Sequence, residues 1–471
     1  MGSLLPHLNA VVLCGRTGDE LWPLVRRKLP RETVTLPGED RSLLVATIER
    51  LKPFVTSFTF VAAEDIAGAI ESCVKASALL KRKDYEIIVE TCPRGSAFPI
   101  ALAAAKIRRR DPNAYVLVMP SHLKVEADDR WEQAVMRCYR VAAEDMVAVM
   151  GIPSKKSSSP HSFIRPSAEI KGIVGARRIS DYIASPSPNQ TSRYIQLGML
   201  WSTGIMMAHA STVLAQLVYV AKHAPNRAYR SLDRIAETAS FLVAIDEENW
   251  RSDEARELVA SLPEASFETA VLSSSDSVAV VPASFEFSEV TTLKSVDDMA
   301  EPDEFDNRII GRGFAIDSEN TTIYDDDRLT VVLGCDDLLV VNTRDSVLVA
   351  SKDALDTLGE VVPELVDAGA SEAETSSVAE HGWGTATTLF ESQGCSVKIL
   401  RILPGRSIPE YARKGSNESW QVLEGSIEYT LGDESLALSA GEQITFSPRE
   451  RHGFSNATKK TVTLMCTEFD S

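Results

Sequence analysis

Apolar and polar positions alternate in two different ways along the first 150 residues. Short, mostly apolar runs that have the length of buried strands occupy 11–13, 58–62, 86–89, 115–119 and 146–150. Between them, apolar residues recur at helical spacing over 43–51, 66–80, 100–107 and 131–141. Strands interleaved with helices predict a parallel, doubly wound α/β sheet. Such sheets bind ligands at the carboxyl ends of their strands, and a loop with Gly15 and Gly18 follows the first run.

One stretch, residues 194–221, carries no Lys, Arg, Asp or Glu and is long enough to raise the question of a membrane span. Polar residues interrupt it, among them Gln196, His209 and Gln216, and Gly204 lies in its first half. The pattern therefore predicts a buried strand followed by a core helix, and no membrane partner.

The pattern of apolar and polar residues changes after about residue 275. Short apolar runs without helical stretches fill 278–290 and 311–350, which predicts a small β-solenoid or meander. Residues 363–380 are rich in Ala, Ser and Glu and are predicted to be a linker. From Gly394 onward, short strand-like runs separated by glycine-containing turns predict a compact barrel or jelly roll.

Composition narrows the class of protein. A chain of 471 residues is too long for one ordinary core and predicts two or three domains. The formal net charge of −18 argues against a nucleic-acid partner, which needs a basic face to displace counterions. Seven scattered cysteines without a C-x-x-C pair fit reduced thiols, and the N-terminus shows no signal-peptide pattern. We therefore expect a cytoplasmic protein.

The loop after the first apolar run carries the first family likeness. Leu21-Trp22-Pro23-Leu24, with Arg26 and Pro30, resembles the A-G-G-S-G-T-R-L-W-P-L-S-R signature of the bifunctional mannose-1-phosphate guanylyltransferase/mannose-6-phosphate isomerase family. Further segments similar to that family's motifs follow in the same order: ETCPRGSAFPIALAAA (90–105), VMPSH (118–122), WSTGI (201–205), PASFEFSEV (282–290) and DLLVVNTRDSVLVA (337–350). The resemblance covers nearly the whole chain.

The resemblance implies an α/β fold in three parts. They are a Rossmann-like nucleotide-diphospho-sugar transferase domain over 1–295, a short left-handed β-helix-like connector over 296–362 and, after a linker at 363–384, a cupin β-barrel over 385–471. The implied activity is transfer of a guanylyl group from GTP to mannose-1-phosphate, with Mg²⁺ as the cofactor if the enzyme is active.

The resemblance also implies the residues of the transferase site. Arg31 and Arg26 stand at the catalytic positions. The predicted nucleotide- and sugar-phosphate-binding residues are Leu13, Gly15, Arg16, Gly18, Arg94 and Gly204. However, Arg16 replaces the family's second glycine, and Glu20 replaces the loop arginine, a change of two charge units beside a triphosphate. The arginines and Lys28 after the loop have two interpretations that stay open here, a phosphate-binding set and a solvated basic patch.

The implied metal site is altered as well. Glu289 retains one acidic position of the family, but His122 stands where the family's P-A-D-H motif has its aspartate, and imidazole is a poor ligand for Mg²⁺. The family's E-K-P motif aligns with Ala184-Ser185-Pro186, so that charged pair is absent.

The predicted isomerase site shows the same loss. A cupin isomerase needs a divalent metal held by histidines to polarise the substrate carbonyl. In the stretch YARKGSNESW (411–420), Glu418 remains, but Arg413, Lys414, Gly415 and Ser419 stand at histidine positions. Glu418 and His452 are the remaining candidate ligands, and we do not expect isomerase activity.

Three hypotheses follow. We favour a catalytically impaired homologue that acts as a nucleotide or sugar-phosphate sensor, or as a regulatory subunit. The second is an active guanylyltransferase without isomerase activity, and the third a structural subunit that assembles through the connector. The predicted partners are GTP or a GDP-sugar, a sugar phosphate, and either a second copy of the chain or an active paralogue.

Overall fold

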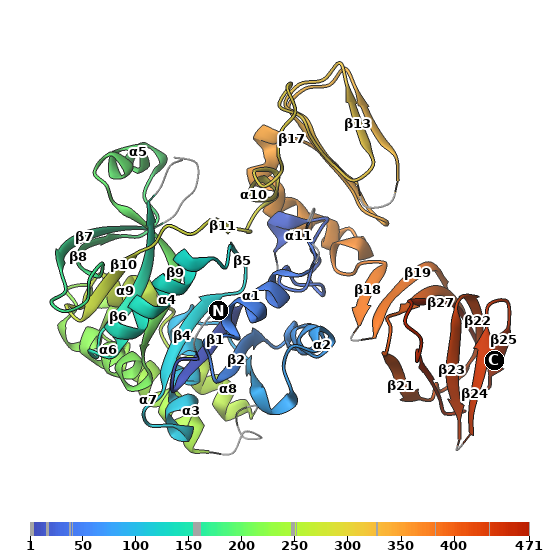
Figure 1. The fold of residues 1–471 in the computed structure, drawn as a ribbon, viewed down its shortest axis with the longest axis horizontal. Helices are drawn as coiled ribbons and strands as arrows, with labels where there is room; N and C mark the ends of the chain where they lie inside the picture. Colours follow the sequence, from blue (N-terminus) through green and yellow to red (C-terminus); the bar gives the residue numbers. More distant parts are fainter. Residues whose placement is uncertain are drawn as a thin grey trace. The chain divides into compact units, whose positions relative to one another are not determined.

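The computed structural model describes residues 4–15, 18–36, 39, 41–153, 162–245, 250, 252–325, 328–381, 383–432 and 434–470 (Figure 1). The chain divides into two compact units. The first contains residues 1–16, 42–68 and 80–290, and the second contains 17–41, 69–79 and 291–471. Residues 17–41, which follow the first strand, therefore belong with the second half of the chain.

A nine-stranded sheet forms the first unit, in the order β3-β2-β1-β4-β9-β6-β10-β8-β7. Its strands are β1 (Leu8–Cys14), β2 (Ser57–Ala63), β3 (Tyr85–Glu90), β4 (Tyr115–Pro120), β6 (Val147–Pro153), β7 (Phe163–Glu169), β8 (Arg177–Ile183), β9 (Leu200–His209) and β10 (Val278–Pro282). The short strands β5 (Leu123–Val125) and β11 (Phe287–Glu289) pair with each other outside it.

The sheet is mixed rather than wholly parallel. Strands β1 to β4 pair in parallel, as do β6 and β10, but β9 runs antiparallel to both β4 and β6. Strands β7 and β8 continue the sheet in antiparallel pairing. The interleaved strands and helices are thus confirmed, and the predicted strands of the first 150 residues, β1 to β4 and β6, all run in one direction. Strands β7, β8 and β9 add antiparallel pairs that the sequence pattern did not predict. Apolar runs mark where strands occur, but they do not encode strand direction.

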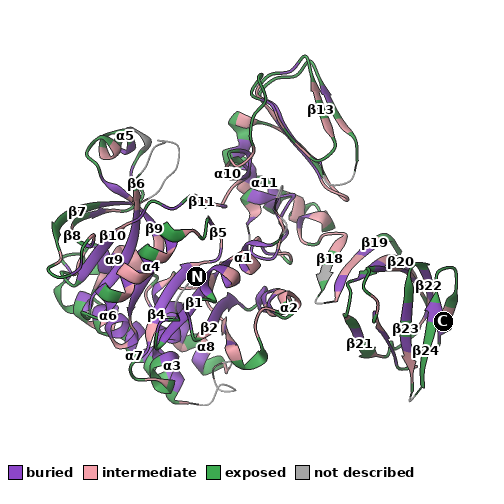
Figure 2. Ribbon diagram, in the orientation of Figure 1, coloured by how far each residue is buried: buried purple, intermediate pink, exposed green. Residues whose placement is uncertain are grey.

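Helices cover both faces of this sheet (Figures 1 and 2). The helices that begin or lie in the first unit are α1 (Leu43–Leu51), α2 (Ala67–Ser77), α3 (Ala97–Arg110), α4 (Asp129–Ala142), α5 (Pro188–Gln196), α6 (Ala210–His223), α7 (Asp233–Ala244), α8 (Asp253–Ala260) and α9 (Phe267–Leu272). Helices α3, α6, α7 and α9 share one apolar core with the strands, and α4 packs against β6, β9 and β10 on the other face. The stretch 194–221 contains β9 and α6, as predicted.

The second unit contains the connector. After α10 (Leu293–Asp297), its strands are β12 (Arg308–Ile310), β13 (Gly313–Ile316), β14 (Thr322–Asp325), β15 (Thr330–Leu333), β16 (Leu338–Asn342) and β17 (Val347–Ser351). β12, β14 and β16 pair in parallel, as do β13 and β15, around buried Ile323, Val332 and Val340. This is the predicted β-helix, which β17 closes in antiparallel pairing with β16.

One side of the connector remains apolar and exposed. Phe314 and Ile316 on β13 lie directly beside Val331 and Leu333 on β15, and all four side chains are about half exposed or more. These four residues are called the β13–β15 patch below. Parallel strands in register align equal faces, so the patch is continuous.

The predicted linker is more ordered than its composition indicates. Helix α11 (Leu358–Asp367) enters it with Pro363 inside the helix, and a 3₁₀ turn covers Ser371–Ala373. Leu358 and Val362 are buried. Leu358 and Val362 lie one turn apart and form the buried face of the helix. The Ala-, Ser- and Glu-rich composition from residue 363 therefore did not show that the helix continues to Asp367.

The final strands form two sheets, ordered β18-β19-β20-β27-β22-β25 and β21-β26-β23-β24. Their bounds are β18 (Val378–His381), β19 (Gly384–Ser392), β20 (Cys395–Ile402), β21 (Ser407–Tyr411), β22 (Ser416–Glu424), β23 (Ser426–Leu431), β24 (Glu434–Ser439), β25 (Gln443–Phe446), β26 (His452–Ser455) and β27 (Val462–Asp470). Inward side chains of both sheets form one core, including Trp420, Phe446 and Phe454. This confirms the predicted barrel. Among the described helices, none has the length and apolar character needed to cross a membrane.

Candidate functional site

The first unit gathers predicted site residues at the carboxyl end of β1. Leu13 ends its apolar run, and its carbonyl accepts hydrogen bonds from the Ser121 backbone N–H (3.1 Å) and hydroxyl (2.8 Å). This double contact joins the ends of β1 and β4, next to Gly15. Arg16, a predicted nucleotide-binding residue, lies outside the described residues.

His122 and Glu289, the predicted metal ligands, lie at neighbouring positions. β11 pairs antiparallel with β5, which places Glu289 opposite Leu123, and the Val290 N–H donates to the His122 carbonyl at 3.0 Å. Two segments more than 160 residues apart thus bring one carboxylate and one imidazole to the same short ladder.

Gly204 lies beside a buried polar cluster that sequence analysis did not identify. A Cβ at Gly204, whose φ is +70°, would lie 3.2 Å from Pro120 and 3.9 Å from the Glu268 carboxylate. Glu268 on α9 accepts a hydrogen bond from the Ser202 hydroxyl and interacts with Tyr182. Burial raises the pKa of Glu268, the two hydrogen bonds oppose that shift, and the charge of Glu289 adds to it.

Arg94 precedes α3, and its guanidinium donates to the backbone carbonyl of Ala260. The backbone on either side is held by Ala265, whose N–H bonds to the Arg94 carbonyl and whose carbonyl accepts from Ala97. Gly95, at φ +72°, stands where the resembling family has asparagine, and a Cβ there would lie 2.4 Å from the Ala265 oxygen. A side chain at residue 95 is therefore incompatible with this backbone.

The loop itself, in the second unit, begins with buried Gly18 and a 3₁₀ turn at Asp19–Leu21. A Cβ on Gly18 would contact Leu21, Val25 and Arg31 at 3.4–3.9 Å, so the glycine fits a tightly packed loop. Glu20 is exposed and its side chain approaches α11 at Gly359.

Each of the four cations in the segment 26–31 lies within 4 Å of a carboxylate of the same unit. The pairs are Arg26 with Asp345 (2.9 Å), Arg27 with Asp19 (3.3 Å), Lys28 with Glu374 (3.6 Å) and Arg31 with Glu32 (3.9 Å). The alternatives for this basic segment were a phosphate-binding set and a solvated patch. The structure presents a third arrangement, in which the positive charge is paired internally.

Arg26 is the most buried of these cations. Its guanidinium donates to Asp345 and to the Ser346 hydroxyl (3.1 Å), and also to the Pro23 carbonyl within the loop. Burial lowers the pKa of Arg26, and the pairing with Asp345 opposes that shift. Asp345 in turn accepts from the Ser377 N–H at 2.6 Å.

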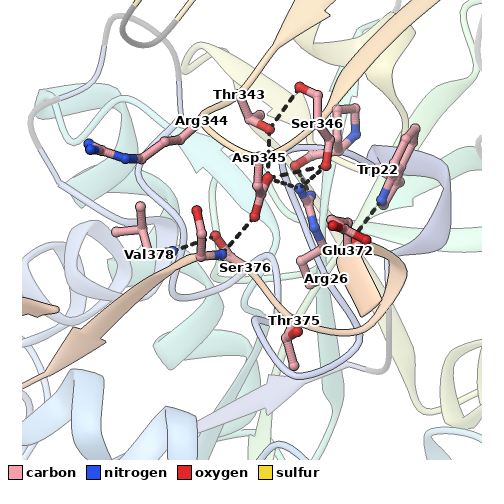
Figure 3. Close-up of polar contacts among 12 residues, drawn as sticks. Trp22, Arg26, Thr343, Arg344, Asp345, Ser346, Glu372, Thr375, Ser376 and Val378 are labelled. Carbon is pink, nitrogen blue, oxygen red and sulfur yellow. Dashed lines mark hydrogen bonds and ion pairs between the residues drawn. The ribbon is translucent and has the colours of Figure 1, made fainter. Parts of the chain in front are cut away.

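Trp22 adds a second attachment of the loop, since its indole N–H donates to the Glu372 carbonyl at 3.1 Å (Figure 3). The Lys28 N–H donates to the Glu374 carbonyl at 3.0 Å. The loop after β1 thus contacts both the β16–β17 turn and residues 372–377, which lead into the cupin. We call this set of contacts the Arg26–Asp345 node.

In the cupin, Glu418 on β22 and His452 on β26 lie together, with Nε2 of His452 3.2 Å from a Glu418 oxygen. Two further groups, Cys466 and Glu468 on β27, offer ligand atoms within 4.8 Å of one another and of Glu418. The Tyr411 hydroxyl donates to Glu418 at 2.7 Å. Burial raises the pKa of Glu418, but the contacts from His452 and Tyr411 outweigh this and leave the pKa below its usual range.

Comparison with known protein families gives one match for each of the three folds. The Nucleotidyl transferase family matches residues 9–217, the MannoseP isomerase/GMP-like beta-helix domain matches 311–365, and the Cupin domain matches 398–468. These three matches coincide with the three folds described above and occur in one order along one chain. The chain thus has a nucleotidyl transferase domain, a β-helix domain and a cupin domain, and this arrangement is similar to that of the bifunctional mannose-1-phosphate guanylyltransferase/mannose-6-phosphate isomerase family.

Relatives of this family match over almost the full length. Alginate biosynthesis protein AlgA of Pseudomonas putida is 26% identical over 93% of this chain and 88% of its own. Xanthan biosynthesis protein XanB of Xanthomonas campestris pv. campestris is 26% identical over 99% and 95%. Mannose-1-phosphate guanylyltransferase RfbM of Salmonella typhimurium is 24% identical over 95% and 91%.

Among solved structures, the mannose-1-phosphate geranyltransferase from Thermus thermophilus superposes with a TM-score of 0.65. It is 24% identical and covers 76% of this chain and 99% of its own. This likeness supports the fold. Identities of 24–26% make these proteins distant relatives of this chain.

The residues at the predicted Mg²⁺ position fit that ion poorly. Mg²⁺ requires near-octahedral oxygen ligands, whereas the two candidate residues next to each other on this ladder are Glu289 and His122, and an imidazole is a poor ligand for Mg²⁺. Glu268 is close enough for its pKa to respond to Glu289, but its carboxyl is engaged by Ser202 and Tyr182. We therefore assign no chemical step to a metal at this position.

The site contains residues that sequence analysis missed, and one of them left a signal. Along β27, Val462, Leu464 and Cys466 alternate as buried residues, and Glu468 continues that inward face. The period of two in a strand therefore marks Glu468 as an inward carboxylate. Glu268 left no such signal, because Ser202 and Tyr182 approach it only in the folded chain.

Proposed function

We propose that this protein is a catalytically impaired member of the family that binds a guanine nucleotide or GDP-sugar together with a sugar phosphate. It would serve as a sensor or regulatory subunit in sugar-nucleotide supply for polysaccharide biosynthesis. The observation that carries the proposal is the internal pairing of Arg26, Arg27, Lys28 and Arg31 with carboxylates of their own unit.

Guanylyl transfer depends on cations that neutralise charge developing on the phosphates in the transition state. A cation already paired with a carboxylate must exchange that partner for a phosphate, so its net gain is small. Glu20 adds an exposed negative charge in the same loop, and His122 replaces a carboxylate at the metal position. With these features the loop can still bind a nucleotide in the ground state through its backbone groups. It stabilises the transition state of guanylyl transfer less well.

The second candidate is an active mannose-1-phosphate guanylyltransferase without isomerase activity. The retained Gly18, Arg31, Arg94 and Glu289 favour it, because they stand at the family's loop, phosphate and acidic positions. RfbM, a relative of this chain, carries that activity in its name.

A direct assay separates the two candidates. Purified protein is incubated with GTP, mannose-1-phosphate and Mg²⁺ while pyrophosphate release is followed, with RfbM of Salmonella typhimurium, which is named for this activity, as the positive control. We expect no release above background, together with a thermal shift on addition of GTP or GDP-mannose. Turnover of about 1–1000 per second would establish the second candidate instead. The absence of any thermal shift would contradict both nucleotide-binding candidates and leave the assembly hypothesis.

A further inference from the structure

The cupin barrel retains a set of groups that would ordinarily attract a cation. Glu418 and Glu468 are directly opposed on neighbouring strands β22 and β27, and Cys466 lies on the same inward face. Their ligand atoms lie within 4.8 Å of one another. Two carboxylates at this distance repel each other strongly unless positive charge lies between or beside them.

The chain itself supplies that positive charge. The Arg413 guanidinium lies 2.7 Å from a Glu468 oxygen through one terminal nitrogen and 3.5 Å from a Glu418 oxygen through Nε. One planar side chain therefore bridges both carboxylates. The Lys398 ammonium also approaches Glu468, at 3.4 Å. Arg413 stands at one of the positions where the family motif has histidine, so a metal-binding side chain has been exchanged for a cation.

His452 is oriented as a ligand would be. Its Nδ1 lies 3.0 Å from the Glu450 carbonyl and therefore carries the proton in that contact, which directs Nε2 to Glu418. Phe446 stacks on the imidazole at 3.8 Å with an interplanar angle of 1°, which fixes the ring. The imidazole is thus held in the orientation that a metal site requires, yet its Nε2 faces a carboxylate that Tyr411 and Arg413 also contact.

We propose that the Arg413 guanidinium takes the place of the divalent cation in this barrel, so that a positive charge of the protein itself neutralises the two carboxylates of the cluster. A guanidinium satisfies carboxylates through directed hydrogen bonds, but it has no open coordination position with which to polarise a carbonyl. A divalent ion entering the cluster would have to displace Arg413 or lie within a few ångströms of it. The barrel is therefore a charge-balanced structural module, and removal of one side chain should convert it into a metal site.

The test is a gain of metal binding in the full-length protein. Chelator-treated wild type and Arg413→His are titrated with Co²⁺, and binding is followed by visible absorption and by calorimetry. We expect the wild type to bind Co²⁺ only weakly, without saturation in the micromolar range. Arg413→His should bind one Co²⁺ in a saturable site, on the order of 100-fold more tightly than that weak binding, and show a thiolate-to-cobalt charge-transfer band from Cys466.

Three further variants make the result specific. Lys414→His introduces the same imidazole and loses the same charge at the adjacent exposed residue, and it should behave as the wild type does. Arg413→His combined with Glu418→Gln should lose the site again. Arg413→Ala, which removes the guanidinium without adding a ligand, should bind Co²⁺ with an affinity between those of the wild type and Arg413→His, and it serves if the histidine variant does not fold. Wild-type binding as tight as that of the variants, equal gain at Lys414→His, or no gain in any Arg413 variant would overturn the proposal.

Discussion

At the scale of single residues, this chain resembles the family motifs but differs from them in which positions carry charge. Glu20 and His122 each reverse or remove a charge at a position where the family carries a phosphate or metal contact. The backbone around them is kept, since Gly18 remains buried and the Glu289 ladder forms. Restoring the charges is therefore a test that leaves the fold in place.

We predict that Glu20→Arg together with His122→Asp raises the affinity for GTP in the presence of Mg²⁺ on the order of tenfold or more, because both changes favour a bound magnesium–phosphate complex. Calorimetric titration with GTP measures the effect. Glu434→Gln, an exposed change in the cupin that alters net charge by the same single unit, should leave the affinity unchanged. Unaltered binding in the double variant would mean that the loop does not contact the phosphates.

A second residue-scale prediction concerns Arg26 and Asp345. Asp345→Ala leaves the buried Arg26 guanidinium without its carboxylate and should destabilise the protein by about 3–5 kcal/mol. Glu374→Ala breaks the exposed pair with Lys28 and should cost no more than about 1 kcal/mol. Denaturant unfolding of both variants gives the comparison. Equal effects would show that the node contributes no more than a surface ion pair does.

The pH dependence of the same pair has a defined sign. Burial by itself raises the pKa of Asp345, but the Ser377 N–H and Arg26 outweigh this and lower it below the usual value of about 3.9. A carboxylate whose pKa is lower in the folded state contributes stability above the unfolded value and loses it as the pH falls through the folded value. The difference in unfolding free energy between wild type and Asp345→Asn should therefore shrink between pH 7 and pH 3. A gap that stays constant over this range would contradict the ionic role.

At the scale of elements, periodicity accounts for most of the secondary structure. The expected helix at 43–51 coincides with α1, and the runs at 58–62 and 115–119 lie within β2 and β4. Periodicity did not predict features that depend on contacts between distant parts of the chain. The reversed direction of β9 follows from its neighbours β4 and β6, and the Arg26–Asp345 contact joins residues 319 positions apart. Local patterns carry information over one or two turns or strands, and these contacts lie far beyond that distance.

The β13–β15 patch is the element-scale feature that bears on assembly. Four exposed apolar side chains in direct register form a surface that solvent disfavours and that a second copy of the chain can cover. We predict that Leu333→Lys lowers the oligomeric state measured by light scattering at micromolar concentration. Val349→Lys, an equally exposed change on β17 of the other connector sheet, is the control and should have no effect. A wild-type protein that is monomeric would remove the assembly hypothesis.

At the scale of the whole molecule, sequence order and structural grouping differ. Residues 17–41 belong with residues 291–471, although β1 ends only three residues before them. Trp22, Arg26 and Lys28 all find their partners between residues 345 and 377. The loop after β1 thus shares its stability with the connector and with the segment that enters the cupin.

Hydrogen exchange tests this grouping. Asp345→Ala should increase amide exchange in residues 18–29 and in residues 371–377 together, while β1 and β4 keep wild-type protection. Glu374→Ala should change neither segment appreciably, because its ion pair is exposed. Loss of protection in β1 alongside the loop would contradict the grouping.

The 319-residue separation within the Arg26–Asp345 node has a consequence for the nascent chain. At a synthesis rate of about 5–20 residues per second, the loop leaves the ribosome roughly 15–60 seconds before the turn that receives its arginine. During that interval the remaining strands of the nine-stranded sheet are synthesised, but Trp22 and Arg26 still lack the groups that hold them. The loop after β1 is thus one of the first segments to be made, yet its contacts can form only after the last strand of that sheet, β10, has been made.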